Sequence, residues 1–265
     1  MSDSHRPRKR FGQNFLKDNR IIDAIIAAAQ LQSDDRVLEI GPGRGALTNR
    51  LLPRVGQLHI MEIDRDLVEA FQQRNDPRLQ VHAGDALHFD WTRLLTQPPY
   101  KLVANLPYNI SSQILFKMLE HRHLFTCMVL MFQKEVGDRL RAEPGTKAYG
   151  ALTVLCQLWF DVERVVLVPP QCFTPAPKVM SEVLCFMRRS APRVEVDDPA
   201  FFARVVKASF AQRRKTLKNS LKASDLAPES VEQAAQQAAI DLQRRGETLN
   251  LIEFARLAKA LHSAT

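Results

Sequence analysis

The chain has 265 residues, of which 45% are hydrophobic, so it can bury one full core and a small second unit. No apolar run reaches the roughly 18–20 residues that a membrane-spanning helix needs, and the first residues are polar and basic. We therefore expect a cytoplasmic protein with no secretory signal and no membrane partner.

The formal net charge of +8 is concentrated in two segments. Residues 1–20 carry six Lys or Arg against two Asp, and residues 204–222 carry seven Lys or Arg and no acid. Clustered cations suit a polyphosphate partner, because each neutralised phosphate releases counterions. A solvated helix face and a basic tail would give the same composition, so charge alone leaves both interpretations open. The cations that we expect to contact such a polyphosphate are Arg8, Lys9, Arg10, Arg213, Arg214, Lys215 and Lys218.

The four cysteines lie too far apart in the sequence for zinc-ligand spacing. Small buried side chains in a reducing compartment are the simpler explanation. We expect no metal site.

The first predicted element is a helix that begins after Asp18, a suitable N-cap, and that has isoleucines at helical spacing. Short apolar strands then alternate with amphipathic helices, which predicts a doubly wound, parallel α/β sheet. The strands are expected at 36–40, 58–63, 79–83, 101–105 and 127–132, and the helices near 46–54, 65–74, 112–121 and 134–141.

Two later apolar runs, at 163–168 and 182–187, have no clear helix between them. They predict an antiparallel pair at one edge of the sheet, joined by a proline-rich loop. Residues 191–199 resemble a linker, and from Pro199 onward only helical periodicity is visible. We therefore expect an α/β domain over residues 1–190, with a basic arm at 1–20, and a helical domain over residues 191–265.

A glycine-rich turn comes after the first strand of the sheet, as Gly41-Pro42-Gly43-Arg44-Gly45. Such a turn lets the backbone approach a ligand at the carboxyl edge of a parallel sheet. The spacing also fits the dinucleotide fingerprint G-x-G-x-x-G/A, so the turn alone leaves a dehydrogenase open.

Acidic residues end the next two strands. Glu62 closes the second strand, where a carboxylate can accept both hydrogens of a ribose diol. Asp85, with Ala86 after it, closes the third, where it can accept from an adenine amine. Either acid could be an ordinary strand-end residue. With the turn, however, they predict a cradle for an adenosine that carries no pyrophosphate, so the expected cofactor is S-adenosyl-L-methionine.

The fourth strand ends in Asn105-Leu106-Pro107-Tyr108, the most specific chemical signal in the chain. The adenine amine is a poor nucleophile because its lone pair is delocalised into the ring, and methyl transfer leaves its nitrogen positive. Acceptors aimed at its N–H groups stabilise this charge in the transition state. The Asn105 side chain and the proline-locked Leu106 carbonyl can supply them, and Tyr108 can stack on the purine. A strand that ends in a β-turn would use similar residues.

Phe173 lies in the proline-rich loop before the last predicted strand. It could form the second wall around a base that has been taken out of its stack. A proline-stiffened edge loop is an equally good interpretation of this segment.

These residues belong to eight motifs in a fixed order. They are FGQNFL (11–16), EIGPGRGALT (39–48), Glu62, GDA (84–86), NLPYNIS (105–111), QKEV (133–136), FTPAPKVMS (173–181) and FAQRRKTLKNSL (210–221). From residue 11 to about residue 260, the chain resembles the bacterial small-subunit ribosomal RNA adenine N6,N6-dimethyltransferases, which modify two adjacent adenosines near the 3′ end of 16S rRNA.

The resemblance implies a Rossmann-like, S-adenosylmethionine-dependent methyltransferase domain with a seven-stranded, mostly parallel sheet, together with a small helical domain after it that engages RNA. It implies a monomer that acts on 16S rRNA in an immature 30S subunit. The target adenine would be framed by residues 105–108 and Phe173. The cofactor would contact Asn14, Leu16, Gly41, Glu62, Asp85 and Asn105, with Gly43 and Ala86 beside them. The place of residues 13–16 over the cofactor comes from the resemblance alone.

The chain departs from similar proteins at Phe132, Gly137 and Ala151, where leucine, alanine and arginine are usual. The first two lie outside the predicted chemistry. Ala151 removes a possible phosphate or structural contact, which leaves the detailed RNA footprint open.

Three alternative functions remain. A large-subunit rRNA methyltransferase of the antibiotic-resistance type would share the glycine turn and the NLPYNIS motif but would methylate 23S rRNA. A DNA adenine methyltransferase would share the N-x-P-Y pattern, although no DNA-groove motif is visible. A non-catalytic assembly factor would still bind the subunit and support growth with Asn105 replaced by alanine.

Overall fold

A computed structural model describes residue 8 and residues 12–224 and 228–263. The chain forms two compact units, and each is discontinuous in sequence. The first unit comprises Met1–Gly137 and Asp161–Arg188, and the second comprises Asp138–Phe160 and Arg189–Thr265.

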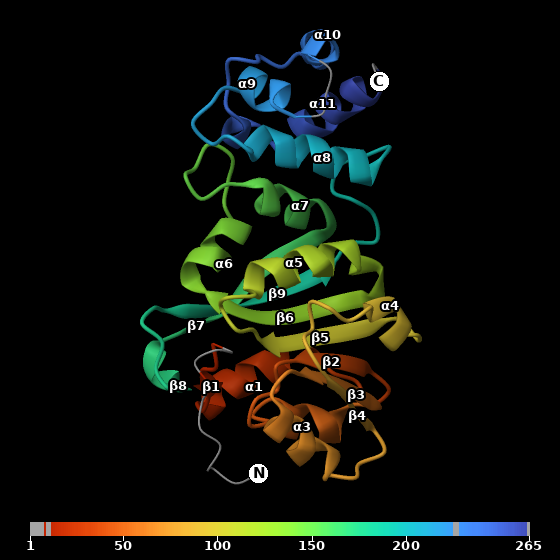
Figure 1. The fold of residues 1–265 in the computed structure, drawn as a ribbon, viewed down its shortest axis with the longest axis vertical. Coiled ribbons are helices and arrows are strands. Elements are labelled where there is room, and N and C mark those ends of the chain that lie inside the picture. Colours follow the sequence, from red (N-terminus) through yellow and green to blue (C-terminus); the bar gives the residue numbers. More distant parts are fainter. Residues whose placement is uncertain (1–7, 9–11, 225–227, 264–265) are drawn as a thin grey trace. The chain divides into compact units, whose positions relative to one another are not determined.

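The first unit is built on a seven-stranded sheet with the order β4-β3-β2-β5-β6-β9-β7 (Figure 1). Strands β2 to β6 pair in parallel, whereas β9 runs antiparallel to β6. This sheet confirms the predicted Rossmann-like fold class. The strands are β2 (Arg36–Ile40), β3 (Gln57–Glu62), β4 (Leu79–Ala83), β5 (Tyr100–Asn105), β6 (Phe125–Gln133), β7 (Phe160–Val168) and β9 (Ser181–Arg188).

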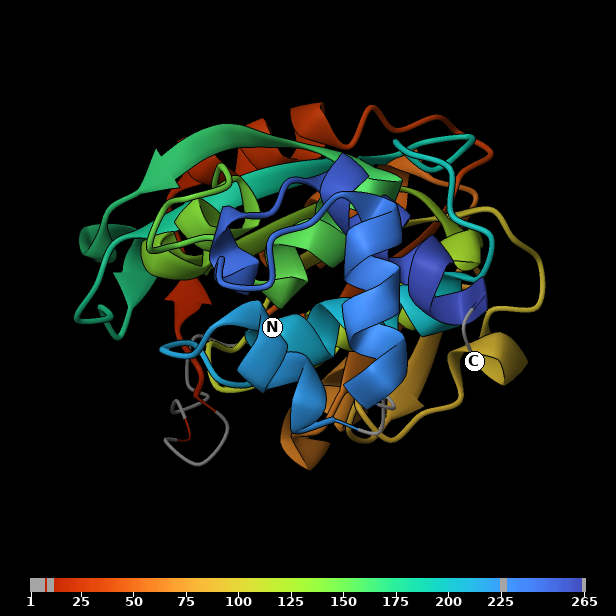
Figure 2. The ribbon, with the colours of Figure 1, turned by 90° about the horizontal axis from the view of Figure 1, so that it is seen from above.

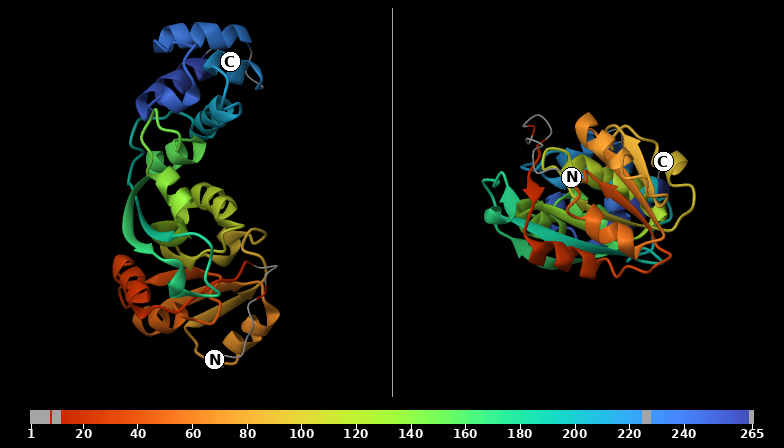
Figure 3. Two further views of the ribbon diagram at one scale, coloured as in Figure 1. Left: turned by 90° about the vertical axis from the view of Figure 1, so that its left-hand side faces the viewer. Right: turned by 90° about the horizontal axis from the view of Figure 1, so that it is seen from below.

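The strand order reverses between β2 and β5, because β3 and β4 lie on one side and β5 and β6 on the other. In a doubly wound sheet, the crevice outside the carboxyl ends of the strands at such a point is the usual ligand site. The middle strands are apolar along most of their length because both of their faces are covered. Figure 3 shows the same sheet and its flanking helices from two further sides.

Helix α1 agrees closely with the prediction. The Asp18 side chain accepts from the backbone N–H of Arg20, and the four isoleucines of the helix are buried in one core cluster with residues of β2, β3 and β6. The other helices of this part of the chain were predicted, except the short helix α4. They are α1 (Asn19–Ala28), α2 (Thr48–Leu51), α3 (Arg65–Gln72), α4 (Trp91–Leu94), α5 (Ser111–Glu120) and α6 (Lys134–Leu140).

A small second sheet joins two distant segments of the first unit. Strand β1 (Phe15–Leu16) pairs antiparallel with β8 (Phe173–Thr174), and the Lys17 N–H donates to the Cys172 carbonyl at 2.9 Å. We call residues 12–17 the N-terminal strap. Each of the two strands in this sheet has two residues, which is too short for a pattern in the sequence to predict.

The second unit is helical within the part of the chain that the structure describes (Figure 2). Its core is formed by large apolar side chains that include Phe202, Val206, Leu221, Phe254 and Leu257. Helical structure after Pro199 was predicted, but helix α7 was not. The helices are α7 (Ala151–Trp159), α8 (Pro199–Phe210), α9 (Leu217–Lys222), α10 (Pro228–Ala238) and α11 (Leu251–Ser263).

Residues 138–160 belong to the second unit, although the sequence boundary at 190 placed them in the first domain. Their backbone is tied to the later helices, since the Gly145 N–H donates to the Glu247 carbonyl at 2.7 Å. A single boundary in the sequence cannot define a unit that is built from two separate segments of the chain. No helix within the described ranges has both the length and the apolar character of a membrane span.

Gly137 lies in α6 at a place where a side chain would collide with β9. A Cβ atom on residue 137 would overlap the carboxylate of Glu182, whose side chain is fully buried. The carboxylate lies 3.8 Å from the Arg164 guanidinium. The glycine therefore makes room for a buried acid.

We expect Gly137→Ala to lower the free energy of unfolding by about 1–3 kcal/mol, although alanine is the better helix former, because overpacking beside Glu182 outweighs helix propensity. Urea unfolding of the purified chain measures this. The change should be smaller in a Glu182→Ala background, since the two side chains compete for one space. Equal losses in both backgrounds would contradict this explanation.

Candidate active site

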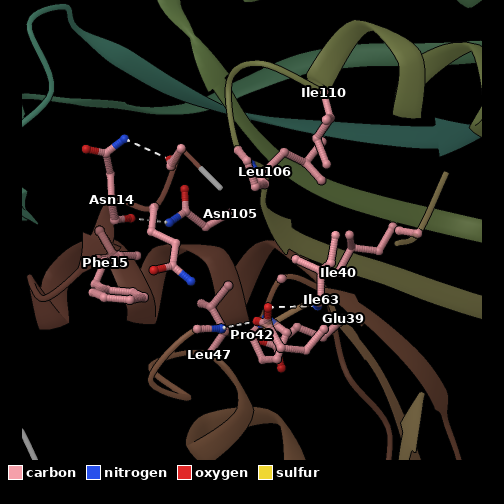
Figure 4. Close-up of a pocket in the computed structure, with 18 of the residues that line it drawn as sticks. Asn14, Phe15, Glu39, Ile40, Pro42, Leu47, Ile63, Asn105, Leu106 and Ile110 are labelled. Atoms are coloured by element: carbon pink, nitrogen blue, oxygen red, sulfur yellow. Dashed lines mark hydrogen bonds between the residues drawn. The ribbon is translucent and has the colours of Figure 1, made fainter. Parts of the chain in front are cut away.

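A cavity of about 840 Å³ opens at the carboxyl ends of β2, β3, β4 and β5 (Figure 4). The N-terminal strap lines it together with the loops that come after these four strands. All the predicted catalytic and cofactor residues except Phe173 are in its lining. They are Asn14, Leu16, Gly41, Gly43, Glu62, Asp85, Ala86, Asn105, Leu106, Pro107 and Tyr108.

The glycine-rich turn is shaped by conformations that favour glycine. Gly41 and Gly43 have φ values of +66° and +55°, which side chains rarely tolerate. A Cβ atom on Gly43 would lie 2.9 Å from the Phe15 ring of the strap, so the glycine allows the strap to pack against the turn. The Arg44 guanidinium lies over the same ring, 4.8 Å from its centroid. The turn and the strap thus form one continuous wall.

Glu62 is held rigidly at the end of β3. Its Oε1 accepts from the backbone N–H groups of Ile63 and Asp64, both at 2.9 Å, and its Oε2 accepts from Gly43 at 3.3 Å. Burial raises the pKa of the Glu62 carboxyl, although these N–H donors lower it. Each carboxylate oxygen has two lone pairs, so Oε2 can still accept from a hydroxyl in the cavity.

Glu39, which was not among the predicted site residues, also lines the cavity. It is 1% exposed, and its carboxylate accepts from the Thr48 hydroxyl at 2.7 Å. Burial raises the pKa of Glu39 to about 8. A carboxylate among the apolar residues Val37, Leu38 and Ile40 was the available signal. A positively charged ligand in the cavity would favour the ionised form of Glu39.

Asn105 has an orientation that hydrogen-bond chemistry fixes. Its Nδ2 donates to the backbone carbonyl of Asn14 at 3.1 Å (Figure 4). A carbonyl can only accept, so the amide cannot be reversed. This leaves Oδ1 as the group that can accept from a ligand in the cavity. Asn14 is itself held by a 3.3 Å hydrogen bond from its side chain to the Gly12 carbonyl.

Tyr108 comes after β5 and Asp85 comes after β4, so the two residues lie on opposite sides of the point where the strand order reverses. Tyr108 is half-buried, and burial raises the pKa of its hydroxyl. Its Oη lies 2.6 Å from Ser181 Oγ. Asp85 Oδ1 accepts from the Leu87 N–H at 2.9 Å, which fixes the carboxylate at the end of the strand.

Phe173 does not line the cavity. It is 2% exposed and packs in the core under the β1–β8 pair, while its neighbour Thr174 lines the cavity. In this structure it is therefore not placed to stack on a base. The strap residues Gly12, Gln13, Phe15 and Lys17 also line the cavity. The resemblance placed residues 13–16 over the cofactor, but these four were not among the individually predicted site residues.

Of the three N-terminal cations predicted to bind RNA, Arg8 pairs with acids of the first unit. Its guanidinium lies 2.8 Å from Asp64 and 2.5 Å from Asp66. Lys9 and Arg10 lie outside the described residues.

The predicted RNA-binding cations of the second unit fall into two groups. Arg213 donates to the Lys147 carbonyl and lies 3.8 Å from Glu247, and Lys218 lies 2.9 Å from Glu232. Arg214 and Lys215 are exposed, and within the described ranges no acid pairs with them. These two are therefore the cations most available to a phosphate.

A nucleoside-sized cavity at the switch point of a Rossmann-like sheet, lined by a glycine turn, strand-end acids and an Asn-Leu-Pro-Tyr segment, defines a methyltransferase. No group of three or more His, Cys, Asp or Glu side chains suited to a metal ion is present within the described ranges. The sequence model of the family described as ribosomal RNA adenine dimethylase matches residues 4–262, and the chain belongs to this family.

Curated relatives agree with this assignment. The ribosomal RNA small subunit methyltransferase A of Syntrophotalea carbinolica is 62% identical over 258 residues, which cover 97% of this chain and 98% of that protein. The protein of the same name from Geobacter sulfurreducens is 48% identical and covers 99% of this chain and 98% of its own length. The predicted family and the predicted methyltransferase class are confirmed.

Two solved structures share the fold over nearly the whole chain. A dimethyladenosine transferase from Plasmodium falciparum matches with a TM-score of 0.78 and 28% identity, covering 94% of this chain and 98% of that one. The 23S rRNA methyltransferase ErmE matches with a TM-score of 0.68 and 28% identity, covering 94% and 100%.

The buried Glu39 predicts a pH dependence of stability. The unfolded chain ionises this residue near its ordinary pKa of 4.5 and the folded chain only near 8, so the folded protein loses stability as the pH rises between these values. The Glu39→Gln variant has no carboxyl to ionise at this position, so it does not lose stability in this way. Its stability relative to the unaltered chain should therefore increase by about 2–4 kcal/mol from about pH 5 to about pH 9.

Urea unfolding at several pH values measures the difference. Glu69→Gln makes the same change at an exposed position of α3 and serves as the control. Parallel pH profiles for Glu39→Gln and the unaltered chain would show that Glu39 is ionised in the folded protein at neutral pH.

Proposed function

We propose that the protein transfers methyl groups from S-adenosyl-L-methionine to N6 of two adjacent adenosines near the 3′ end of 16S rRNA, with an immature 30S subunit as its substrate. The observation that carries the chemistry is the orientation of Asn105, whose nitrogen is bonded to the Asn14 carbonyl and whose oxygen is thereby left for the amine. The choice of small-subunit RNA is supported by the names of the relatives at 62% and 48% identity.

The residues of the cavity fit S-adenosyl-L-methionine, which would supply the activated methyl group. Glu62 Oε2 has an acceptor position left for a ribose hydroxyl. Ile63 lines the cavity and yet is 43% exposed, so an adenine ring placed there would cover an apolar side chain. Glu39 and Glu62 both line the cavity, and a ligand with a positive charge beside them would favour their ionised forms.

In the proposed mechanism, the protein holds the target amine in line with the methyl group and stabilises the charge that develops on its nitrogen. Asn105 Oδ1 and the Leu106 carbonyl accept from the two N–H groups of the amine, and these bonds strengthen as the nitrogen becomes positive. Tyr108 stacks on the purine. The methylated nitrogen loses its proton readily to water, so a general base is not needed.

The second unit engages RNA in this proposal, through its exposed cations Arg214 and Lys215. Cations that already have an acidic partner gain less from a phosphate, because they must first give up that partner. We also propose that the protein acts as a monomer in the cytoplasm.

Methylation of 23S rRNA is the main alternative, since ErmE shares the fold over 94% of this chain. The identity to ErmE is 28%, however, against 62% to a small-subunit methyltransferase. Small-subunit RNA is therefore the better-supported substrate.

We expect the purified protein, given labelled S-adenosyl-L-methionine and immature 30S particles, to produce dimethyladenosine near the 3′ end of 16S rRNA. Asn105→Ala should lower kcat by roughly 10²–10³-fold, the usual loss for one group that stabilises transition-state charge. Asn109→Ala makes the same truncation at an exposed residue of the cavity wall and should lower kcat less than tenfold.

Mass spectrometry of digested rRNA identifies the product, and particles of the large subunit provide the comparison. Dimethyladenosine in 23S rRNA but not in 16S rRNA would favour the alternative. Full activity of the Asn105→Ala chain would remove Asn105 from the mechanism.

The pairing of cations in the second unit predicts which of them contribute to RNA binding. Arg214→Ala with Lys215→Ala should reduce the slope of log K against log salt for 30S binding by about 1–2, because each lost phosphate contact removes slightly less than one. Lys218→Ala with Lys222→Ala removes two cations that already pair with Glu232, so it should change the slope less. Equal changes for the two double variants would show that pairing within the protein does not matter.

A further inference from the structure

We propose that Ser181 is a positioning residue for methyl transfer. Its hydroxyl anchors the far end of the Tyr108 side chain and so sets where the target base stacks. This inference rests on the proposed function, because it takes Tyr108 as the residue that stacks on the adenine.

Tyr108 needs an anchor because it lies outside any helix or strand. A tyrosine on a loop can sample several rotamers, and a stacking surface is useful only when the ring is held in one place. The hydroxyl of Tyr108 lies 2.6 Å from Ser181 Oγ, a short and well-formed hydrogen bond. The bond fixes the position of the outer end of the ring and therefore the direction of its long axis.

Ser181 is a rigid anchor because it belongs to the sheet. It is the first residue of β9 and lies opposite Gln133 in the antiparallel pairing with β6. Its side chain is fully buried. A buried hydroxyl without a partner is costly, so Ser181 and Tyr108 stabilise each other's placement.

A second buried serine holds the other end of the same residue. Ser111 Oγ, at the start of α5, donates to the Tyr108 carbonyl at 3.0 Å. Ser111 is 2% exposed. The backbone and the outer end of Tyr108 are thus fixed independently, one from a helix and one from a strand. This arrangement exceeds what a surface tyrosine requires, and it suits a residue whose ring must stay in place through repeated methyl transfers.

The loop between β8 and β9 connects Thr174, which lines the cavity, to Ser181. The segment that starts in the cavity wall therefore finishes at the anchor of Tyr108. Val179 and Met180, the two residues before Ser181, are 44% and 37% exposed. The anchor of Tyr108 therefore lies at the end of a segment that starts in the cavity wall.

The test is the methylation kinetics of Ser181→Ala and Tyr108→Phe on immature 30S particles. Each variant loses the same hydrogen bond and keeps the aromatic ring. We expect kcat to fall and KM for the RNA substrate to rise, with a combined loss in kcat/KM of about tenfold, the typical effect of one hydrogen bond. Affinity for S-adenosyl-L-methionine, measured by calorimetry, should not change, because neither residue bonds to Glu62 or Asp85.

The double variant separates positioning from a general loss of stability. If the two hydroxyls act only through each other, Ser181→Ala with Tyr108→Phe should be no worse than either single change. Ser209→Ala is the matched control, since Ser209 is buried in the second unit and bonds to the Val205 carbonyl at 2.8 Å. Its kinetics should equal those of the unaltered chain, even if it unfolds at a lower urea concentration.

The proposal is overturned if Ser181→Ala keeps the kcat and KM of the unaltered chain, or if the losses of the two single variants add in the double variant. Tyr108→Phe keeps the test decisive should Ser181→Ala fail to fold. Absence of adenine methylation by the unaltered chain would instead reject the proposed function, and this inference with it.

Discussion

The backbone carbonyl of Asn14 can accept a hydrogen bond but cannot donate one, and this fact determines the orientation of Asn105. The carbonyl is in place because the N-terminal strap pairs with β8 through Phe15 and Leu16 and packs its Phe15 ring on Gly43. The orientation of the Asn105 amide therefore depends on a segment about ninety residues earlier in the chain. The strap closes the wall of the cavity and also sets which atom of Asn105 faces the ligand.

The cavity holds buried acids that the protein stabilises in two ways. Glu62 receives three backbone N–H donors, which is how proteins usually hold a carboxylate away from water. Glu39 has the Thr48 hydroxyl and stays protonated over a wider pH range. The backbone donors hold the Glu62 carboxylate in one position, whereas the charge of Glu39 depends on what lies beside it.

Regular patterns in the sequence predicted the alternating strands and helices, the Asp18 cap, and the strand-end residues Glu62, Asp85 and Asn105. Parallel strands carry their carboxyl ends to one edge, so residues at those ends meet whatever their separation in the chain. The strap could be predicted only from the resemblance to a known family, because strands of two residues are too short to show an alternating pattern of apolar residues. Phe173 was expected in the cavity but faces the core, and Thr174 lines the cavity instead, since one residue of register decides which side chain faces the core.

Helix α7 buries Val154, Leu155, Cys156 and Leu158 among the helices of the second unit, yet it lies before β7 and β9 in the chain. A fragment cut at residue 190 would lack this helix and would leave part of its hydrophobic interior open to water. The helical unit therefore cannot be separated from the rest of the chain by a single cut. During synthesis the hydrophobic interior of the helical unit cannot be completed until the final helices have left the ribosome. The apolar side chains of α7 therefore lack these packing partners while the edge strands of the sheet are synthesised.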